Sequence, residues 1–228
     1  MSLAIITGAS RGLGLALARE LAARGWALVI DARGAGDLER AARELGQITE
    51  VVALPGDVAD DWHRGVLVEA AGAHIDLLVN NASLLGPSPQ PPLAVYPLGV
   101  LERVYRVNVL GPLALAQLVL PRLTEGGRII NLSSDAAVEA YEGWGGYGSS
   151  KAALDHLTAI LGAEHPELRV YSVDPGDMRT QMHQEAFPGE DISDRPPPEA
   201  SVPGLLALLG GDTSSGRYRI EPSELVGT

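Results

Sequence analysis

Short apolar runs alternate with longer segments of helical periodicity along the whole chain, and this alternation restricts the fold more than any other feature. The apolar runs lack a polar face, as expected for parallel strands covered on both sides. They are Leu3–Thr7, Ala27–Asp31, Val51–Leu54, Asp76–Asn80, Arg128–Leu132 and Arg169–Val173. The helices predicted between them are Gly12–Arg24, Asp37–Leu45, Asp60–Ala73, Leu98–Leu123 and Tyr147–Glu164. This order predicts an α/β fold with a single doubly wound parallel sheet, right-handed crossovers and helices on both faces.

No repeat or linker divides the sequence, so residues 1–228 are predicted to form a single domain. The segment SGRYRI near the C-terminal end is a candidate for a further strand. Two proline-rich segments, Leu84–Pro97 and Phe187–Pro203, break the alternation and are predicted to be irregular. Loops of that length in a compact domain are usually lids, binding loops or disordered segments.

Composition excludes several classes of function. The formal net charge of -12 argues against nucleic acid as a partner, because phosphate binding requires a basic surface. The absence of cysteine excludes disulfides and thiol catalysis and agrees with a cytoplasmic protein. No apolar run reaches the roughly 18 residues of a membrane span, and the first residues do not resemble a signal peptide. The histidines show no metal-ligand spacing, so no metal is expected.

A glycine-rich turn joins the first predicted strand to the first predicted helix. In IITGASRGLG, Thr7 and Gly8 are followed by Gly12 and Gly14. Glycines there permit a tight turn and close approach of a pyrophosphate, which the free N–H groups of the helix N-terminus would bind. The spacing T-G-x-x-x-G-x-G resembles that of the short-chain dehydrogenase/reductase family, and the resemblance extends from Thr7 to about Thr180. It implies a Rossmann-like dinucleotide-binding domain in which Ser10, Arg11 and Leu13 also contact the cofactor.

The second strand suggests which dinucleotide is bound, although two interpretations compete. Asp31 near the strand end is the type of residue that binds ribose hydroxyls and favours NAD(H). In the family pattern, however, Ala32 occupies the acidic position and Arg33 follows it. Arg33 and Arg11 are both suited to binding a 2′-phosphate, since guanidinium groups clasp phosphates well. We therefore predict NADP(H), with NAD(H) open if Asp31 reaches the ribose.

The resemblance implies further cofactor contacts after the third, fourth and sixth strands. Asp57, after the third strand, is one of the implied contacts, but either Asp57 or Asp60 could instead cap the helix that follows. In VNNAS, Ser83 stands where the family pattern N-N-A-G has glycine, which leaves the local turn geometry open. The implied contacts are Asp57 and Val58 at the adenine, Asn80, Asn81 and Ala82 in support of the sheet and cofactor, and Pro175, Gly176 and Thr180 at the nicotinamide.

Tyr147 and Lys151 are four residues apart, on one face of a predicted helix. Lys151 is the only lysine in the sequence, the other basic residues being arginine. A nearby ammonium stabilises a phenolate and would lower the tyrosine pKa from about 10 toward neutral pH. A tyrosine tuned in this way can donate a proton to a carbonyl oxygen or accept one from an alcohol. The family resemblance adds that this lysine holds the nicotinamide ribose.

Two other residues complete the family's catalytic tetrad. Ser134 precedes Tyr147 by thirteen positions, the family spacing, and its hydroxyl is expected to bind the reacting oxygen. Asn108 lies within a predicted helix, where asparagine is unfavourable, and the resemblance implies a local break and a water linked to the lysine. The neighbouring Ser133 is expected to form an ordinary turn or backbone hydrogen bond.

The resemblance implies NADP(H)-dependent hydride transfer between the nicotinamide and a small carbonyl or alcohol substrate. The substrate loop is expected at about residues 178–203, and Leu98–Leu123 with Tyr147–Glu164 would form a homodimer or homotetramer surface. One alternative is a non-catalytic dinucleotide-binding sensor or scaffold, and another is an epimerase or dehydratase on the same scaffold. His183 is expected at the surface rather than in the pocket. Trp144 and Tyr141 are either pocket wall or packing, and Asp174 has no assignable role.

Overall fold

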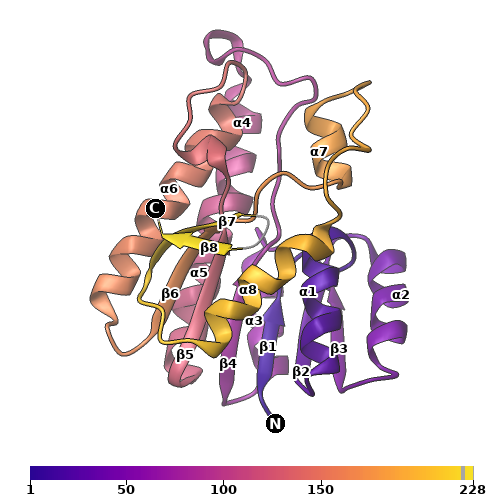
Figure 1. The fold of residues 1–228 in the computed structure, drawn as a ribbon, viewed down its shortest axis with the longest axis vertical. Coiled ribbons are helices and arrows are strands. Elements are labelled where there is room, and N and C mark those ends of the chain that lie inside the picture. Colours follow the sequence, from indigo (N-terminus) through magenta and orange to yellow (C-terminus); the bar gives the residue numbers. More distant parts are fainter. Residues whose placement is uncertain (222–223, 228) are drawn as a thin grey trace.

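The computed structural model, which describes residues 1–221 and 224–227, contains an eight-stranded sheet in the order β3-β2-β1-β4-β5-β6-β7-β8 (Figure 1). The first seven strands are parallel to one another, and β8 is antiparallel to β7. The six predicted strands are confirmed, and SGRYRI contributes β7. The strands are β1 (Leu3–Ile6), β2 (Ala27–Ala32), β3 (Val51–Pro55), β4 (Ile75–Asn80), β5 (Leu123–Leu132), β6 (Arg169–Asp174), β7 (Gly216–Glu221) and β8 (Glu224–Gly227).

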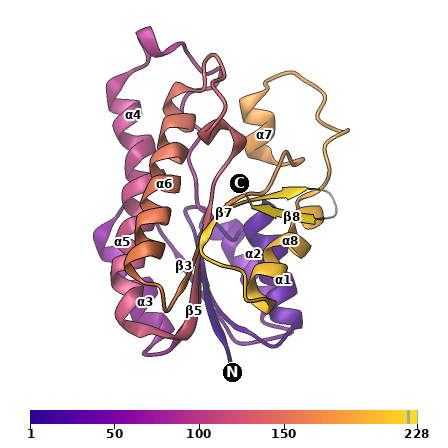
Figure 2. The same ribbon diagram turned by 60° about the vertical axis from the view of Figure 1, so that its left-hand side comes forward.

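Helices cover both faces of the sheet, as the sequence predicted (Figure 2). One face packs against α1 (Gly12–Ala23), α2 (Ala35–Leu45) and α8 (Val202–Gly210). The other face packs against α3 (Asp61–Ala71), α5 (Gly111–Val119) and α6 (Gly145–Glu164), and α4 (Leu98–Tyr105) lies against α6. Each layer buries its own apolar cluster against the sheet, which explains why the strands are apolar on both sides.

The predicted long helix over Leu98–Leu123 is interrupted in the structure. Residues Arg106–Leu110 form a π-helical turn between α4 and α5, and a 3-10 turn over Leu120–Arg122 ends the segment. Asn108 lies within the π-helical turn. A turn of this kind leaves the regular ladder of backbone hydrogen bonds and is frequent at functional sites.

Taken together with its π-helical and 3-10 turns, the helical segment Leu98–Arg122 has the length and, at 1.3, the mean hydropathy of a membrane-crossing helix. Half of its apolar window is buried inside the protein. Its buried side chains, among them Leu115 and Val119, belong to the apolar cluster beneath the sheet. These contacts are those of a core helix in an α/β protein.

The two proline-rich segments differ in how far they are irregular. Leu84–Pro97 contains only a 3-10 turn over Leu93–Val95, which agrees with the prediction. Phe187–Pro203 instead ends in a 3-10 turn over Pro198–Ser201 and the start of α8, and α7 (Gln181–Ala186) precedes it. Neither helix was predicted. Helix α8 (VPGLLALLG) is short, contains glycine and proline and is apolar around most of its circumference, so it has no helical periodicity to detect.

All the parallel strands end at the same edge of the sheet, and the chain reverses its winding direction between β1 and β4. In open α/β sheets, ligands bind beyond the carboxyl ends of the strands at such a switch point. Helix α7 lies above this edge (Figure 1). Every residue that the sequence nominated after a strand therefore lies on one side of the molecule.

Candidate functional site

The turn after β1 has a backbone that only glycine can adopt without strain. Gly8 and Gly12 have φ values of +66° and +57°, and a Cβ on Gly8 would come within 2.9 Å of the Ala82 Cα. The Asn81 amide holds the turn by donating to the carbonyl oxygens of Thr7 (2.8 Å) and Gly8 (3.0 Å). Helix α1 then begins with no side-chain cap on its first N–H groups. Uncapped N–H groups beside a glycine turn form an anion site.

Asp31 does not face the open end of the sheet. Its side chain is 1% exposed, and its two carboxylate oxygens accept hydrogen bonds from the Gly8 backbone N–H (2.8 Å) and pair with His63 Nε2 (3.0 Å). Burial raises the pKa of this carboxyl, and the His63 and Gly8 hydrogen bonds oppose that rise. Asp31 is therefore an internal brace for the glycine turn.

Replacing Asp31 by alanine should destabilise the fold by about 3 kcal/mol or more, because it leaves the buried His63 ring and the Gly8 N–H without their acceptor. Urea unfolding monitored by tryptophan fluorescence measures this loss. Asp37→Ala, which removes an exposed carboxylate paired with Arg40, is the matched control and should change the unfolding free energy by less than about 1 kcal/mol. Equal effects of the two substitutions would show that Asp31 does not brace the turn.

Arg11 and Arg33 are both exposed at the carboxyl edge of the sheet. Arg11 has extended backbone at the N-cap of α1, and Arg33 directly follows β2. Asp57 lies near Arg33, pairs with Arg103 of α4, and accepts a hydrogen bond from the Ala59 N–H at 2.9 Å. Desolvation by burial raises the pKa of Asp57. The hydrogen bonds and the positive charges of these neighbours outweigh that effect, so the pKa lies below its usual range. Asp60, not Asp57, caps α3 by accepting from the Trp62 N–H.

Several residues nominated as cofactor contacts have buried side chains with internal partners. The Asn80 amide donates to Asn131 Oδ1 at 2.8 Å and so links β4 to β5. Leu13 and Val58 lie in the two apolar clusters of the core. Any contact of Leu13 or Val58 with a ligand would therefore use mainly the backbone, whereas Asn80 supports the sheet beneath the site.

Tyr147 and Lys151 both lie on the buried face of α6, 8% and 2% exposed. The Lys151 Nζ donates to the Leu132 carbonyl oxygen at 2.7 Å and lies 5.5 Å from the centroid of the Tyr147 ring. The ammonium is thus directed toward the end of β5 and away from bulk solvent. Burial lowers the pKa of Lys151 to about 8.

The pKa of Tyr147 is raised above its ordinary value in this structure, opposite to the prediction from the sequence. Burial is the largest cause, and the nearby carboxylates of Asp174 and Asp135 act in the same direction. Hydrogen bonding from the hydroxyls of Ser83 and Ser134 acts against the rise. Desolvation of the phenolate therefore outweighs the stabilisation that the sequence pattern had suggested.

Ser134 follows β5 and faces the same region. Its Oγ lies 2.9 Å from Asp135 Oδ1, and the other Asp135 oxygen accepts from the Tyr141 hydroxyl at 3.0 Å. The Ser133 hydroxyl is buried and has no hydrogen-bond partner in the part of the chain that the structure describes. The Ser133 backbone N–H donates to the Val173 carbonyl oxygen at 2.7 Å, so the expected backbone hydrogen bond at this position is confirmed.

Asn108 is fully buried and joins three segments through its side-chain amide. Its Oδ1 accepts from the Leu84 N–H (2.8 Å) and the Ser83 hydroxyl (3.2 Å). Its Nδ2 donates to the Leu84 carbonyl oxygen and to Ser150 Oγ, each at 2.9 Å. The amide thus uses both of its N–H groups and accepts two hydrogen bonds. Ser83 has no positive φ, so the substitution of serine for glycine leaves the turn unstrained.

A cavity lies beside Tyr147. Its lining includes Ser134, Tyr147, Pro175, Gly176 and Thr180, but not Lys151 or Asn108. Thr180 reaches the glycine turn, because a Cβ on Gly12 would lie 3.7 Å from its methyl group. The Thr180 hydroxyl caps α7 by accepting from the His183 N–H. The remaining lining residues are Leu85, Ser133, Asp135, Trp144, Asp174, Asp177, Met178, Met182, His183 and Ala186.

His183 and Trp144 were ambiguous in the sequence, and both line the cavity. The His183 ring stacks near Phe187, with centroids 4.9 Å apart, so the expectation of a surface histidine is wrong. Trp144 contacts the edge of Tyr147, with centroids 5.9 Å apart, and also lies near Phe187 of the segment after α7. Tyr141 contacts Trp144 and Asp135 but is not itself part of the lining.

Comparison with known proteins identifies the family. The family described as short chain dehydrogenase matches residues 2–191. The chain belongs to the short-chain dehydrogenase/reductase family. It is 33% identical to the sepiapterin reductase of Mus musculus over 199 residues, which covers 79% of this chain and 76% of that protein. It is 36% identical to the serine 3-dehydrogenase of Agrobacterium fabrum over 183 residues, covering 78% and 72%.

Solved structures agree with this assignment. An alcohol dehydrogenase from the archaeon Thermococcus sibiricus, complexed with 5-hydroxy-NADP, superposes with a TM-score of 0.85 at 29% identity and covers 98% of this chain and 97% of its own. An oxidoreductase from E. coli superposes with a TM-score of 0.87 at 27% identity, covering 98% and 95%. This short-chain dehydrogenase/reductase is therefore an oxidoreductase with the Rossmann-like fold predicted from its glycine turn, and the family acts on small molecules.

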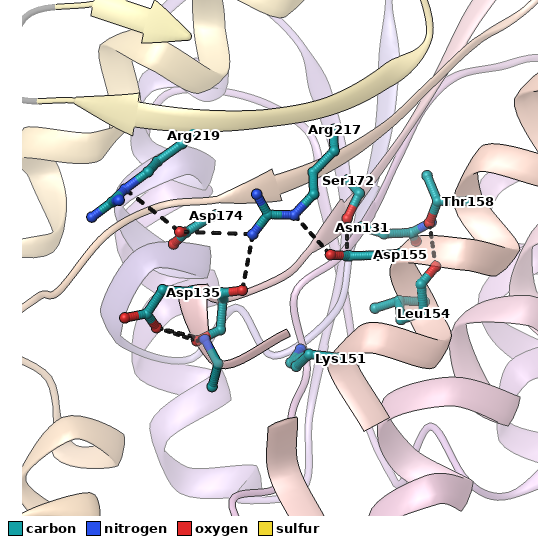
Figure 3. Close-up of polar contacts among 12 residues, drawn as sticks. Asn131, Asp135, Lys151, Leu154, Asp155, Thr158, Ser172, Asp174, Arg217 and Arg219 are labelled. Carbon is teal, nitrogen blue, oxygen red and sulfur yellow. Dashed lines mark hydrogen bonds and ion pairs between the residues drawn. The ribbon is translucent and has the colours of Figure 1, made fainter. Parts of the chain in front are cut away.

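An ionic cluster that was not predicted includes Asp174 of the cavity lining. Figure 3 shows Arg217 of β7 reaching between Asp174, at the end of β6, and Asp155, on α6. Its guanidinium donates to Asp155 Oδ2 (2.8 Å) and to the Ser134 carbonyl oxygen (3.1 Å), and it lies 3.9 Å from Asp174 Oδ2. Arg219 approaches the same Asp174 oxygen at 3.7 Å. Arg217 thus ties β7 to the backbone of Ser134 and to α6 one turn beyond Lys151.

The sequence contained only a weak signal for this cluster. Arg217 and Arg219 alternate in RYRI, so they share one face of a strand, and Asp174 ends the neighbouring β6. The Arg217 side chain is only 16% exposed, and a largely buried arginine requires carboxylate partners. The pairing of Asp174 with Arg219 across β6 and β7 depends on strand register, which the sequence does not reveal.

Proposed function

We propose that this protein is an NADP(H)-dependent oxidoreductase that interconverts a small carbonyl compound and the corresponding alcohol, with Tyr147 as the general acid and base. The observation that carries the proposal is that Tyr147 and Ser134 line one cavity together with Thr180, which in turn lies against the glycine turn at Gly12. Lys151 Nζ lies 5.5 Å from the centroid of the Tyr147 ring, and Asn108 of the π-helical turn is linked to the Tyr147 carbonyl oxygen through the Ser150 hydroxyl. A proton carrier, an oxygen-binding hydroxyl and a dinucleotide cradle at one place are the parts that such a reaction requires.

The residues present fit a phosphorylated dinucleotide. The uncapped N-terminus of α1 and the positive φ of Gly8 and Gly12 suit a pyrophosphate. Arg11 and Arg33 are free to face a 2′-phosphate at the exposed edge, while the carboxylate of Asp31 is directed inward to Gly8 and His63. This arrangement supports NADP(H) over NAD(H), and the Thermococcus sibiricus neighbour was solved with 5-hydroxy-NADP. When bound, the cofactor supplies or accepts the hydride.

The residues of the chain would handle the proton and the substrate oxygen. Ser134 Oγ would donate a hydrogen bond to the carbonyl oxygen and orient it toward Tyr147. The Tyr147 hydroxyl would deliver its proton to that oxygen during reduction and accept it back during oxidation. Because burial raises the pKa of Tyr147, the phenol is protonated at the start, which suits carbonyl reduction. Lys151 would stabilise the resulting phenolate and hold the nicotinamide ribose.

The role of Asn108 is narrower than the sequence suggested. Its amide makes four hydrogen bonds with Ser83, Leu84 and Ser150. Because the side chain is fully occupied, a water linked to Lys151 would be bound by the Asn108 backbone carbonyl in the π-helical turn. We propose that the side chain supports the geometry of the site and the backbone supports the proton relay.

The same proposal includes a substrate loop, a homo-oligomeric assembly and a cellular location. Residues 178–203, which contain α7 and contribute Met178, Met182 and His183 to the cavity, would form the substrate loop. Exposed apolar side chains on α5 and α6, including Leu118 (41%) and Ile160 (42%), support a homodimer or homotetramer through these helices. Absence of cysteine supports a cytoplasmic location.

The cofactor assignment predicts a selective effect of two arginines. Replacing Arg11 and Arg33 together by alanine should raise the KM for NADPH by about 100-fold, because two charge-assisted hydrogen bonds to a phosphate are lost. The KM for NADH should change by less than about threefold, since NADH has no 2′-phosphate. Initial rates across a panel of ketones and aldehydes, with NADPH and NADH in parallel, measure this. Rates with NADH that equal or exceed those with NADPH in the unmodified enzyme would overturn the assignment.

A further inference from the structure

The backbone of Ser134 lies just beyond the last hydrogen bond that joins β5 to β6. That bond runs from the Ser133 N–H to the Val173 carbonyl oxygen at 2.7 Å, and the strand pairing itself ends at Leu132. Ser134 has extended backbone, with φ of -163° and ψ of 159°, and a 3-10 turn over Asp135–Ala137 follows it. The residue proposed to bind the substrate oxygen therefore begins a loop, where contacts other than the strand pairing set its orientation.

Arg217 makes such a contact from another element. Its guanidinium donates to the Ser134 carbonyl oxygen at 3.1 Å, and the same oxygen accepts from the Ala137 N–H at 3.1 Å. The Ala137 bond closes the 3-10 turn and moves with it, so it cannot orient the turn relative to the sheet. The Arg217 bond can, because Arg217 belongs to β7 and stands opposite Ser172 of β6 in the sheet.

The guanidinium is itself held by Asp155 of α6. Arg217 Nε donates to Asp155 Oδ2 at 2.8 Å, and Asp155 Oδ1 accepts from the Ser172 hydroxyl. Both side chains are largely buried, with Arg217 16% and Asp155 13% exposed. A planar guanidinium holds two acceptors in fixed directions through separate N–H groups. Asp155 therefore directs another N–H of the guanidinium toward the Ser134 carbonyl oxygen (Figure 3).

Helix α6 thus contacts the end of β5 at two carbonyl oxygens. Lys151, one turn before Asp155, donates directly to the Leu132 carbonyl oxygen at 2.7 Å. Asp155 reaches the Ser134 carbonyl oxygen through Arg217. Tyr147 lies on the same helix, so these two links hold the helix of Tyr147 and the segment of Ser134 in one relative position.

We propose that Arg217 is a positioning residue which, by linking the Ser134 carbonyl oxygen to Asp155, sets where the Ser134 hydroxyl lies relative to Tyr147. This inference rests on the proposed function, in which both hydroxyls bind the same substrate oxygen. Arg217 does not line the cavity, so it acts through Ser134. Because each residue has only two soft backbone dihedrals, a carbonyl held in one direction limits where the side chain of the same residue can lie.

The test is the reduction of a prochiral ketone with NADPH, using the panel ketone that the unmodified enzyme reduces with the highest enantiomeric ratio. Arg217→Met should lower kcat by about 10- to 100-fold, because misplacing a group at the reaction centre by about 1 Å has an effect of this order. The KM for NADPH should stay within about threefold, since the glycine turn is on another element. The enantiomeric ratio of the alcohol should fall by about threefold or more, because the carbonyl is held less firmly in one orientation.

Two further variants separate positioning from folding. Arg217→Met leaves the largely buried Asp155 carboxylate without this partner, so it should also destabilise the protein. The double variant Asp155→Asn/Arg217→Met removes both charges and should unfold in urea closer to the unmodified enzyme, yet keep the low kcat and the low enantiomeric ratio. Arg219→Gln is the matched control on the same strand. Arg219 is 48% exposed and approaches Asp174 at 3.7 Å, and its loss should change kcat by less than about threefold.

The outcomes separate this inference from the proposed function. A lower kcat and a lower enantiomeric ratio in Arg217→Met and in the double variant, with neither change in Arg219→Gln, support the role of Arg217. Recovery of both quantities in the double variant would overturn it, since Arg217 would then serve only to neutralise Asp155. Unchanged quantities in Arg217→Met, or equal losses in Arg219→Gln, would also overturn it and leave the proposed function standing. Absence of carbonyl reduction by the unmodified enzyme would remove the proposed function and this inference together.

Discussion

Replacing Tyr147 by phenylalanine should lower kcat by about 10³-fold while leaving the Kd for NADP(H) within about threefold of its original value. The substitution removes only the hydroxyl, so the ring keeps its edge contact with Trp144 and its place in the apolar cluster with Leu85. The protein loses the only phenol that lines the cavity among the residues that the structure describes. Without it, the substrate oxygen has no acid to protonate it as the hydride arrives.

Single-turnover kinetics and cofactor fluorescence titration measure the two quantities separately. Tyr141→Phe is the matched control, because Tyr141 bonds Asp135 but does not line the cavity. Its kcat should fall by less than about tenfold. Retention of most activity in Tyr147→Phe would rule out the proton carrier proposed above. A protein with no measurable turnover before substitution, but with tight cofactor binding, would instead favour a dinucleotide sensor or scaffold.

Replacing Lys151 by methionine should lower kcat/KM by about 10²- to 10³-fold, because one preorganised charge beside the reacting tyrosine is lost. Methionine matches the length and shape of the buried stem, so packing between α6 and β5 is kept. Lys151→Arg should be almost as damaging. A planar guanidinium has five N–H donors, and the Leu132 carbonyl oxygen is the only hydrogen-bond acceptor found for this ammonium in the described residues.

The lowered pKa of Lys151 adds a control that does not depend on activity. The folded protein releases this proton near pH 8, whereas an unfolded lysine retains it to about pH 10.4. Between these values the unfolded state binds more protons, so Lys151 makes the free energy of unfolding rise with pH. Lys151→Met should lose this rise between pH 8 and about 9.5 in urea unfolding experiments. An identical pH dependence in the two proteins would show that the ammonium is not buried as described.

The location of residues that directly follow the strands could be predicted from the sequence, because the strands of a parallel sheet all end at the same edge. Ser134 follows β5 and Pro175 follows β6, and both line the cavity at that edge. Directions of side chains could not be predicted in the same way. Asp31 could have faced a ribose, but its carboxylate is taken by the Gly8 N–H and by His63, a residue 32 positions away.

Some helices could be predicted from the sequence and others could not. Strongly amphipathic helices such as α2 were predicted to within two residues. Their apolar side chains recur with the helical period and are separated by charged ones, which indicates a helix with one buried face. Helix α8 was missed because its apolar side chains surround it and carry no period. The π-helical turn at Asn108 was anticipated only as a local break, since its form depends on contacts with Ser83, Leu84 and Ser150 in other segments.

The sequence by itself determined the doubly wound sheet, the glycine turn and the candidate catalytic side chains, because periodicity and short motifs encode local backbone and its order along the chain. Only the tertiary structure decided which charged groups surround the site. Arg217 donates to the Ser134 carbonyl oxygen, the Asp31 carboxylate accepts from the Gly8 N–H, and the pKa of Tyr147 is raised instead of lowered. The physical reason is that desolvation and ion pairing depend on which distant residues become neighbours, and the register and packing of the strands set those neighbours.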